Sequence, residues 1–120
     1  GPLTLVLYAQ SSLMWDLGDT NGTVALRMPR DDAALKLLVE VGPMAVTSAN
    51  VSGQPPARTI LDAAAQLGSA VSVYLDSGPS AAGLASTILD CTDDAPVILR
   101  AGALSVSQIQ QVLGDIELRN

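Results

Sequence analysis

The sequence predicts an α/β fold in which helices flank a twisted, open mixed sheet. Apolar runs with strand spacing alternate with runs at helical spacing, in the approximate order β-β-α-β-α-β-β-β-α. The last strands follow one another closely, so part of the sheet should be antiparallel. Phe is absent and aromatic residues make up only 2% of the chain, so Val, Leu, Ile and Ala must build the core.

The first half of the chain contains three predicted strands and one predicted helix. Strand patterns cover residues 3–8, 23–28 and 44–48, and the polar stretch 10–22 is predicted to be a loop. Asp31 is a suitable cap for a helix over about residues 32–41, where apolar side chains recur at helical spacing. Gly42-Pro43 should end that helix.

The second half begins with an irregular segment, residues 49–58, before a helix that runs from Thr59-x-x-Asp62 to Leu67. Strands are predicted at 71–75, 86–91 and 96–100, and the last two form a pair across an Asp-rich turn. Ser105-x-x-Gln108 should cap a final helix that ends at Gly114. A chain of 120 residues is long enough for one small domain, and we expect no repeat or linker.

Charge and composition argue against several classes of function. The formal net charge is −6, and the basic residues are scattered rather than clustered: Arg27, Arg30, Lys36, Arg58, Arg100 and Arg119. Nucleic-acid binding requires clustered basic side chains, so a stand-alone RNA binder fits poorly. The absence of His removes Ser-His-Asp triads and His-ligated metals.

Three features predict a cytoplasmic location without a membrane partner. The single cysteine, Cys91, cannot form an internal disulfide. No stretch approaches the roughly 18 apolar residues of a membrane span. The N-terminus lacks the basic region of a signal peptide. Gly1-Pro2 is either a protease scar or native sequence at the start of an internal fragment.

Polar residues at strand ends are the candidate ligand-binding groups. In open α/β sheets, ligands bind beyond the carboxyl ends of strands. Ser48 and Asn50 follow a predicted strand and offer short donors and acceptors, while Gly53 permits an unusual turn. This loop suits phosphate or ribose, although these residues alone slightly favour a plain polar connection between strand and helix.

Arg27, Arg100 and Ser86 form a second set of candidates near strand ends. The planar guanidinium of arginine suits a carboxylate or a phosphate, but arginines on exposed strand faces and at strand ends are common. Ser86 and Thr87 can hold a ligand or simply satisfy backbone groups. Neither a Gly-x-Gly-x-x-Gly nor a Gly-x-x-x-x-Gly-Lys motif is present. The residues alone therefore predict a domain that binds a small ligand.

Five segments together form a more specific pattern. They are GPLT at 1–4, GTVALRMP at 22–29, GPMAVTSANVSG at 42–53, STILD at 86–90 and ILRAGA at 98–103. In this order they resemble the YrdC-like threonylcarbamoyl-AMP synthases, also called L-threonylcarbamoyladenylate synthases. The resemblance implies that residues 1–113 are the C-terminal part of a YrdC-like domain, present as a partial domain, and that residues 114–120 are a C-terminal tail.

The resemblance implies a nucleotidyltransferase that joins L-threonine, bicarbonate and ATP into threonylcarbamoyl-AMP and releases pyrophosphate. Downstream proteins would transfer the threonylcarbamoyl group to the tRNA adenosine next to the anticodon, so tRNA is met only indirectly. Mg²⁺ would bridge phosphate oxygens, mostly through water and substrate rather than a protein metal site. Such a reaction needs no catalytic side-chain nucleophile, because positioning and charge neutralisation suffice.

Carried over position by position, the resemblance implies two groups of site residues. The threonine-binding group is Arg27, Val46 through its backbone, and Ser86. The ATP-binding group is Thr23, Ser48, Asn50, Pro56 and Arg100. Some relatives carry a Ser near the nucleotide where this chain has Pro56.

The family's Lys-x-Arg signature has no counterpart in these 120 residues. We therefore expect about half of the site here, no synthesis by this chain alone, and self-association through exposed sheet edges near residues 3–8. One alternative is a carbamoyltransferase-type YrdC-like domain. Another is a non-catalytic translation factor that binds tRNA or double-stranded RNA, which a steep salt dependence of RNA binding would favour.

Overall fold

The computed structural model describes residues 1–80, 83–114 and 117–118, and it divides into two compact units. The first unit comprises Gly1–Arg30 and the chain from Leu84 onward. The second comprises Asp31–Gly83. Predicted site residues occur in both units.

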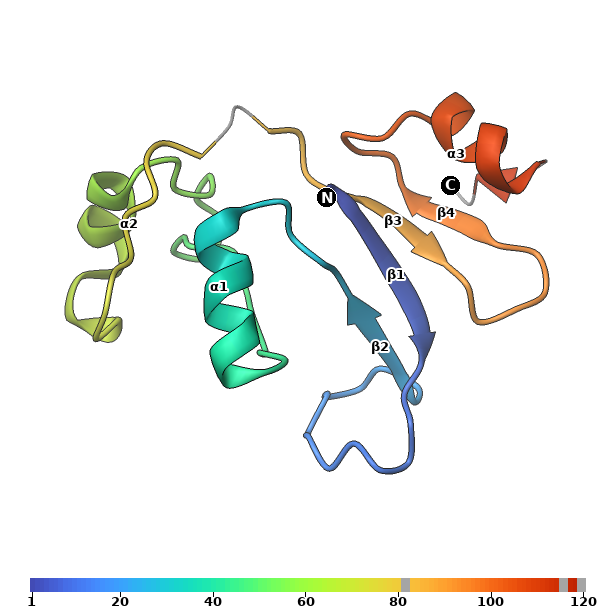
Figure 1. The fold of residues 1–120 in the computed structure, drawn as a ribbon, viewed down its shortest axis with the longest axis horizontal. Helices are drawn as coiled ribbons and strands as arrows, with labels where there is room; N and C mark the ends of the chain where they lie inside the picture. Colours follow the sequence, from blue (N-terminus) through green and yellow to red (C-terminus); the bar gives the residue numbers. More distant parts are fainter. Residues whose placement is uncertain (81–82, 115–116, 119–120) are drawn as a thin grey trace. The chain divides into compact units, whose positions relative to one another are not determined.

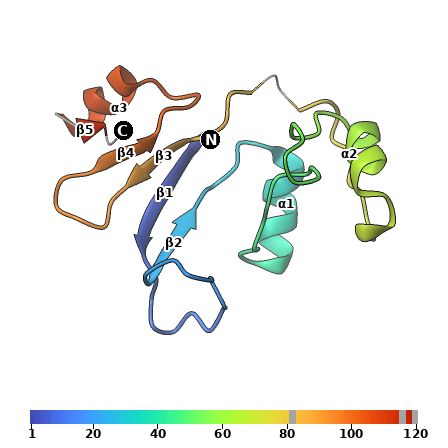
Figure 2. The same ribbon diagram turned by 180° about the vertical axis from the view of Figure 1, so that it is seen from behind.

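The first unit is built on a five-stranded mixed sheet with the order β2-β1-β3-β4-β5 (Figures 1 and 2). β1 pairs antiparallel with β2 and parallel with β3, while β4 pairs antiparallel with β3 and parallel with β5. The predicted mixed α/β sheet is thus confirmed. Its strands are β1 (Leu3–Tyr8), β2 (Thr23–Leu26), β3 (Thr87–Asp90), β4 (Val97–Arg100) and β5 (Glu117–Leu118).

The core of this unit lies between the sheet and helix α3 (Val106–Leu113). Leu89 on β3, Ile98 on β4 and Ile109 on α3 form a buried cluster, and Ile98 is fully buried. Leu, Val and Cys side chains pack around it, as the absence of Phe requires. The helix begins with a complete capping box between Ser105 and Gln108, as the sequence predicts.

The second unit contains helices α1 (Asp32–Val41) and α2 (Ile60–Leu67), followed by a short 3₁₀ helix, η1 (Gly68–Ala70). The side chain of Asp31 caps α1 by accepting a hydrogen bond from the Ala34 amide. The Thr59 hydroxyl caps α2 by accepting a hydrogen bond from the Asp62 amide. Both predicted helices are therefore confirmed at both ends.

Two predicted strands are wrong. Residues 44–48 and 71–75 form no strand in the structure. A strand requires a neighbour that completes its backbone hydrogen bonds, and neither segment has a place in the sheet. Their apolar side chains are correspondingly exposed, with 84% of Val46 and 70% of Val73 accessible.

The expectation about sheet edges also needs correction. β1 is not an edge, because β2 and β3 pair with it on its two sides, whereas β2 and β5 are the outer strands of the sheet. Short outer strands offer little template for pairing with another chain. β2 ends at Leu26, two residues before the predicted end, and β5 lies within the segment expected to be a tail.

No helix among the described residues is long and apolar enough to cross a membrane.

Candidate functional site

Ser86 lies directly before β3 and is 8% exposed. Its hydroxyl oxygen is 2.7 Å from the hydroxyl oxygen of Thr4 on β1. The two residues meet because β1 and β3 are parallel neighbours whose register pairs Leu3 with Thr87. Thr4 was not among the candidates taken from the individual residues. Its hydroxyl in the otherwise apolar run of residues 3–7 is the sequence feature that could have identified it.

Arg100 is the last residue of β4 and reaches across to Ser86. Its Nη2 donates to the Ser86 carbonyl oxygen at 2.7 Å, and its Nε does so at 3.2 Å. Nη2 also lies 3.2 Å from the Ser86 hydroxyl. Two predicted site residues, one from the threonine group and one from the ATP group, are therefore in direct contact. A guanidinium held at one side keeps its remaining donors available for an anion.

The neighbouring Thr87 fixes the loop that follows Arg100. Thr87 is fully buried, and its hydroxyl donates to the Leu104 carbonyl at 2.7 Å. The same oxygen accepts hydrogen bonds from the amides of Gly102 and Leu104 at 3.1 and 3.0 Å. A Cβ on Gly102 would lie 2.3 Å from the carbonyl oxygen of Ala85, so only glycine fits there. This packing holds the strand end that carries Arg100 against the segment that carries Ser86.

Arg27 and Thr23 belong to the same unit but make separate contacts. Arg27 follows β2, is exposed, and donates from Nε to the Gly1 carbonyl at 2.9 Å. Thr23 begins β2, and its hydroxyl donates to the Thr20 carbonyl at 2.8 Å. In the described hydrogen bonds neither residue joins Ser86 and Arg100 directly.

The predicted site residues Val46, Ser48, Asn50 and Pro56 lie in the second unit, and the last two belong to a loop of residues 49–57. Val46 and Ser48 are exposed, and Asn50 is half-buried. The loop is closed by a hydrogen bond from the Ala57 amide to the Ala49 carbonyl at 2.9 Å, and an inner turn joins the Gln54 amide to the Val51 carbonyl. The irregular backbone predicted here is therefore an organised closed loop.

Side chains add three more bonds to this loop. Asn50 Nδ2 donates to the Val51 carbonyl at 2.9 Å, while its Oδ1 is buried and has no partner among the described atoms. Gln66 on α2 accepts from the Val51 amide at 2.9 Å and donates to the Pro55 carbonyl at 3.1 Å. No residue-level pattern singled out Gln66, because its role depends on how α2 lies against the loop.

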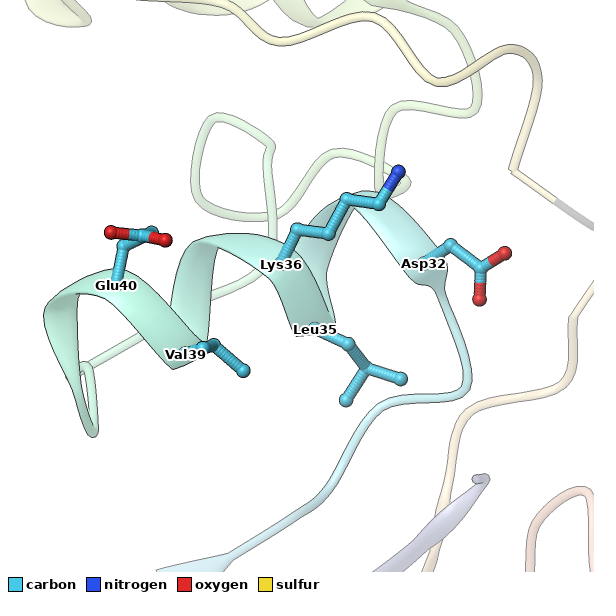
Figure 3. A pocket seen from close by; sticks show the side chains of 5 residues that line it. All are labelled: Asp32, Leu35, Lys36, Val39 and Glu40. Carbon is cyan, nitrogen blue, oxygen red and sulfur yellow. The ribbon is translucent and has the colours of Figure 1, made fainter.

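Shallow depressions are present among the described residues of the second unit, and two of them lie beside the loop and along α1. One, of about 340 Å³, borders the loop and includes Pro56 of the predicted ATP group. Its full lining is Pro55, Pro56, Ala57, Arg58, Asp62, Ala65 and Gln66. The other, of about 470 Å³, lies along α1 and contains none of the predicted site residues (Figure 3).

Among the residues that the structure describes, no three His, Cys, Asp or Glu side chains lie close enough to hold a metal ion. Cys91, just after β3, packs against the core. Burial raises the pKa of its thiol above the ordinary value, and the neighbouring Asp90 carboxylate raises it further. Cys91 is therefore a packing residue with a weakly acidic thiol, and it does not behave as an activated nucleophile.

Comparison with known proteins finds one matching protein family and several similar sequences. The family model for Sua5, YciO and YrdC proteins, described as "Telomere recombination", matches residues 1–102. The chain is 60% identical over 114 residues to the "Putative threonylcarbamoyl-AMP synthase" of Mycobacterium leprae, covering 95% of this chain and 52% of that protein. It is 42% identical over 97 residues to the threonylcarbamoyl-AMP synthase of Bacillus subtilis, covering 80% of this chain and 28% of that one.

A solved structure gives the same result. Sua5 from P. abyssi, crystallised in complex with L-threonine, superposes with a TM-score of 0.90 at 36% sequence identity. The match covers 99% of this chain and 35% of that one. The chain spans about half the length of the first curated relatives it matches.

Proposed function

This chain belongs to the Sua5, YciO and YrdC family, and from that membership we propose that it forms part of an enzyme that makes threonylcarbamoyl-AMP. The observation that supports this most strongly is the match of 99% of the chain to a Sua5 that was crystallised with L-threonine. Relatives named threonylcarbamoyl-AMP synthase, with identities of 60% and 42%, point to the same reaction.

The proposed reaction couples three substrates in two bond-forming steps. The threonine amine attacks the carbon of bicarbonate, water leaves, and a carbamate forms. A carbamate oxygen then attacks the α-phosphorus of ATP, and the bond to the β-phosphate oxygen breaks, so pyrophosphate leaves. Both steps depend on alignment of the reactants and on neutralisation of phosphate charge.

On the threonine side, we propose that Arg27 binds the carboxylate, the Val46 backbone meets the amino acid, and the Ser86 hydroxyl accepts or donates a further hydrogen bond. Arginine supports the first role because its planar fork can pair with both carboxylate oxygens. Arg27 uses Nε for the Gly1 carbonyl, so its two Nη groups are the ones proposed for threonine.

On the ATP side, the proposed groups are Thr23, Ser48, Asn50, Pro56 and Arg100. The buried Oδ1 of Asn50 supports a ligand here, because an unpartnered buried acceptor costs free energy unless a donor reaches it. Phosphate oxygens carry no proton to donate, whereas a ribose hydroxyl or a water bound to Mg²⁺ does. We propose that Asn50 Oδ1 accepts from one of these two donors. Mg²⁺, where it takes part, would be held by the phosphates and water rather than by protein side chains.

Proteins that transfer the threonylcarbamoyl group to tRNA are the proposed partners, and the single cysteine supports a proposed cytoplasmic location. The Lys-x-Arg signature has no counterpart in these 120 residues. The complete site would therefore also contain residues that lie outside this sequence.

The test is pyrophosphate release by the full-length protein, with threonine, bicarbonate and ATP each omitted in turn. Arg27→Met should raise the KM for threonine about tenfold or more, because a hydrogen bond between charged groups is lost. Arg30→Met, a change of an exposed arginine three residues away, is the matched control and should leave that KM unchanged. Release that needs neither threonine nor bicarbonate would contradict the proposal, and dependence on carbamoyl phosphate would favour the carbamoyltransferase-type alternative.

A further inference from the structure

Gln66 is the side chain that ties the loop of residues 49–57 to helix α2. Its amide spans two points of the loop that lie four residues apart, since Oε1 accepts from the Val51 amide and Nε2 donates to the Pro55 carbonyl. The two partners determine the orientation of the Gln66 amide, because an N–H group can only donate and a carbonyl can only accept.

The bond at Val51 connects Gln66 to Asn50. The Val51 amide is held by Gln66, and the Val51 carbonyl accepts from both Asn50 Nδ2 and the Gln54 amide. Hydrogen bonds thus fix both peptide groups that flank Val51, one through its N–H and the other through its carbonyl. Fixing the Val51 carbonyl fixes the donor side of the Asn50 amide, and this determines where the unpartnered Oδ1 of Asn50 lies.

We propose that Gln66 is a positioning residue for nucleotide binding, which holds the Asn50 loop in its binding conformation before ATP arrives. The proposal rests on the proposed function, in which Ser48 and Asn50 contact ATP. A loop that is ordered beforehand avoids the entropy cost of ordering when the ligand binds. Gln66 itself lies on α2 and acts through Val51 and Pro55, not through contact with the substrate.

The chemistry of a Gln66→Glu change separates this role from simple packing. Glutamate keeps the length and shape of the side chain and retains an acceptor for the Val51 amide. It replaces the Nε2 donor with a carboxylate oxygen that faces the Pro55 carbonyl, so one attraction becomes a repulsion. A packing role would tolerate this near-isosteric change, whereas a clamp would lose one of its two hydrogen bonds.

The experiment measures KM values for ATP and for threonine in the full-length protein with Gln66→Leu, Gln66→Glu and the control Gln111→Leu, a change of an exposed glutamine on α3. Loss of two neutral hydrogen bonds should raise the KM for ATP about fivefold to thirtyfold in Gln66→Leu, and less in Gln66→Glu. The KM for threonine should stay within about twofold in both, and Gln111→Leu should match the unchanged protein.

Hydrogen exchange of the Val51 amide provides a second readout that does not depend on activity. Exchange should accelerate in Gln66→Leu and remain close to that of the unchanged protein in Gln66→Glu, which keeps the acceptor. An unchanged KM for ATP in Gln66→Leu, or an equal rise of both KM values, would overturn the positioning role. If the unchanged protein releases no pyrophosphate with its three substrates, the proposed function fails instead, and the two failures are distinguishable.

Discussion

Ser86, which directly precedes β3, contacts Thr4 on β1 and Arg100 on β4, although 82 positions separate Ser86 from Thr4. Thr4→Val and Ser86→Ala should each lower the free energy of unfolding by about 1 kcal/mol, because each removes the part-buried hydrogen bond between the two hydroxyls. Ser86→Ala also removes the 3.2 Å contact with Arg100 and should be the more destabilising of the two. The double variant should cost less than the sum of the two single changes, since both remove the same bond.

Urea unfolding of the single and double variants measures this coupling in the full-length protein. Thr47→Val, a change of an exposed threonine in the second unit, is the matched control and should leave the urea midpoint nearly unchanged. Strict additivity of Thr4→Val and Ser86→Ala would show that the two hydroxyls do not interact in solution.

Cys91 gives a prediction about pH. The pKa of its thiol is raised in the folded protein by burial and by Asp90, so the folded state holds this proton more tightly than the unfolded state does. The associated stabilisation is complete below the ordinary thiol pKa, and it is lost as the pH rises through the raised value. The urea midpoint should therefore fall as the pH increases above about 8.5.

Cys91→Ala should flatten that fall, and thiol reagents should modify Cys91 more slowly in the folded protein than after denaturation in urea. An identical pH dependence of Cys91→Ala and the unchanged protein would contradict the assignment of the effect to this thiol.

At the scale of elements, the turn after β4 depends on the close approach of Gly102 to the segment before β3. Its added Cβ would lie 2.6 Å from both the Ser86 carbonyl carbon and the Thr87 amide nitrogen. Backbone atoms on two segments would have to move apart, so Gly102→Ala should destabilise the protein by about 3 kcal/mol. Ala103→Ser, a change at the exposed neighbour, should cost little. Equal melting temperatures for the two variants would contradict this packing.

The elements also show which parts of the fold the sequence can predict. The α-helices α1, α2 and α3 of the described residues were predicted with their caps, because capping and helical periodicity are local signals at residues such as Asp31, Thr59 and Ser105. The segments 44–48 and 71–75 share the composition of strands but lack a partner in the sheet, and pairing is not encoded locally. The central position of β1 was missed for the same reason.

The site residues show the same difference between local signals, which the sequence reveals, and long-range contacts, which it does not. Ser86 and Arg100 were predicted as separate groups near strand ends, and the register of β3 against β4 brings them into contact. Thr87 satisfies backbone groups, which is one of the two roles that the sequence left open for it. Gly102 and Gln66 escaped residue-level reasoning, because their roles lie in contacts with backbone that is distant in the sequence. For the roles of Arg27, Val46 and Pro56, family resemblance remains the source of the prediction.

At the scale of the whole molecule, the 120 residues carry two arginines of the proposed site, Arg27 and Arg100, and a formal net charge of −6. ATP brings several negative charges, which a synthase must neutralise during attack on the α-phosphorus. The 120-residue chain alone should therefore release no pyrophosphate above a blank without protein. The full-length protein at equal concentration is the control, and release by the short chain that requires both threonine and bicarbonate would contradict this expectation.

The most direct test of the central claim is to identify the product by mass spectrometry after incubating the full-length protein with L-threonine, ATP and bicarbonate labelled with carbon-13. The account predicts threonylcarbamoyl-AMP that contains the labelled carbon between the threonine nitrogen and the phosphate, formed in equal amount to pyrophosphate. Arg27→Met should reduce its yield at low threonine, and Gln66→Leu should reduce it at low ATP. Pyrophosphate without a labelled adenylate, or a product whose carbon does not come from bicarbonate, would contradict the account.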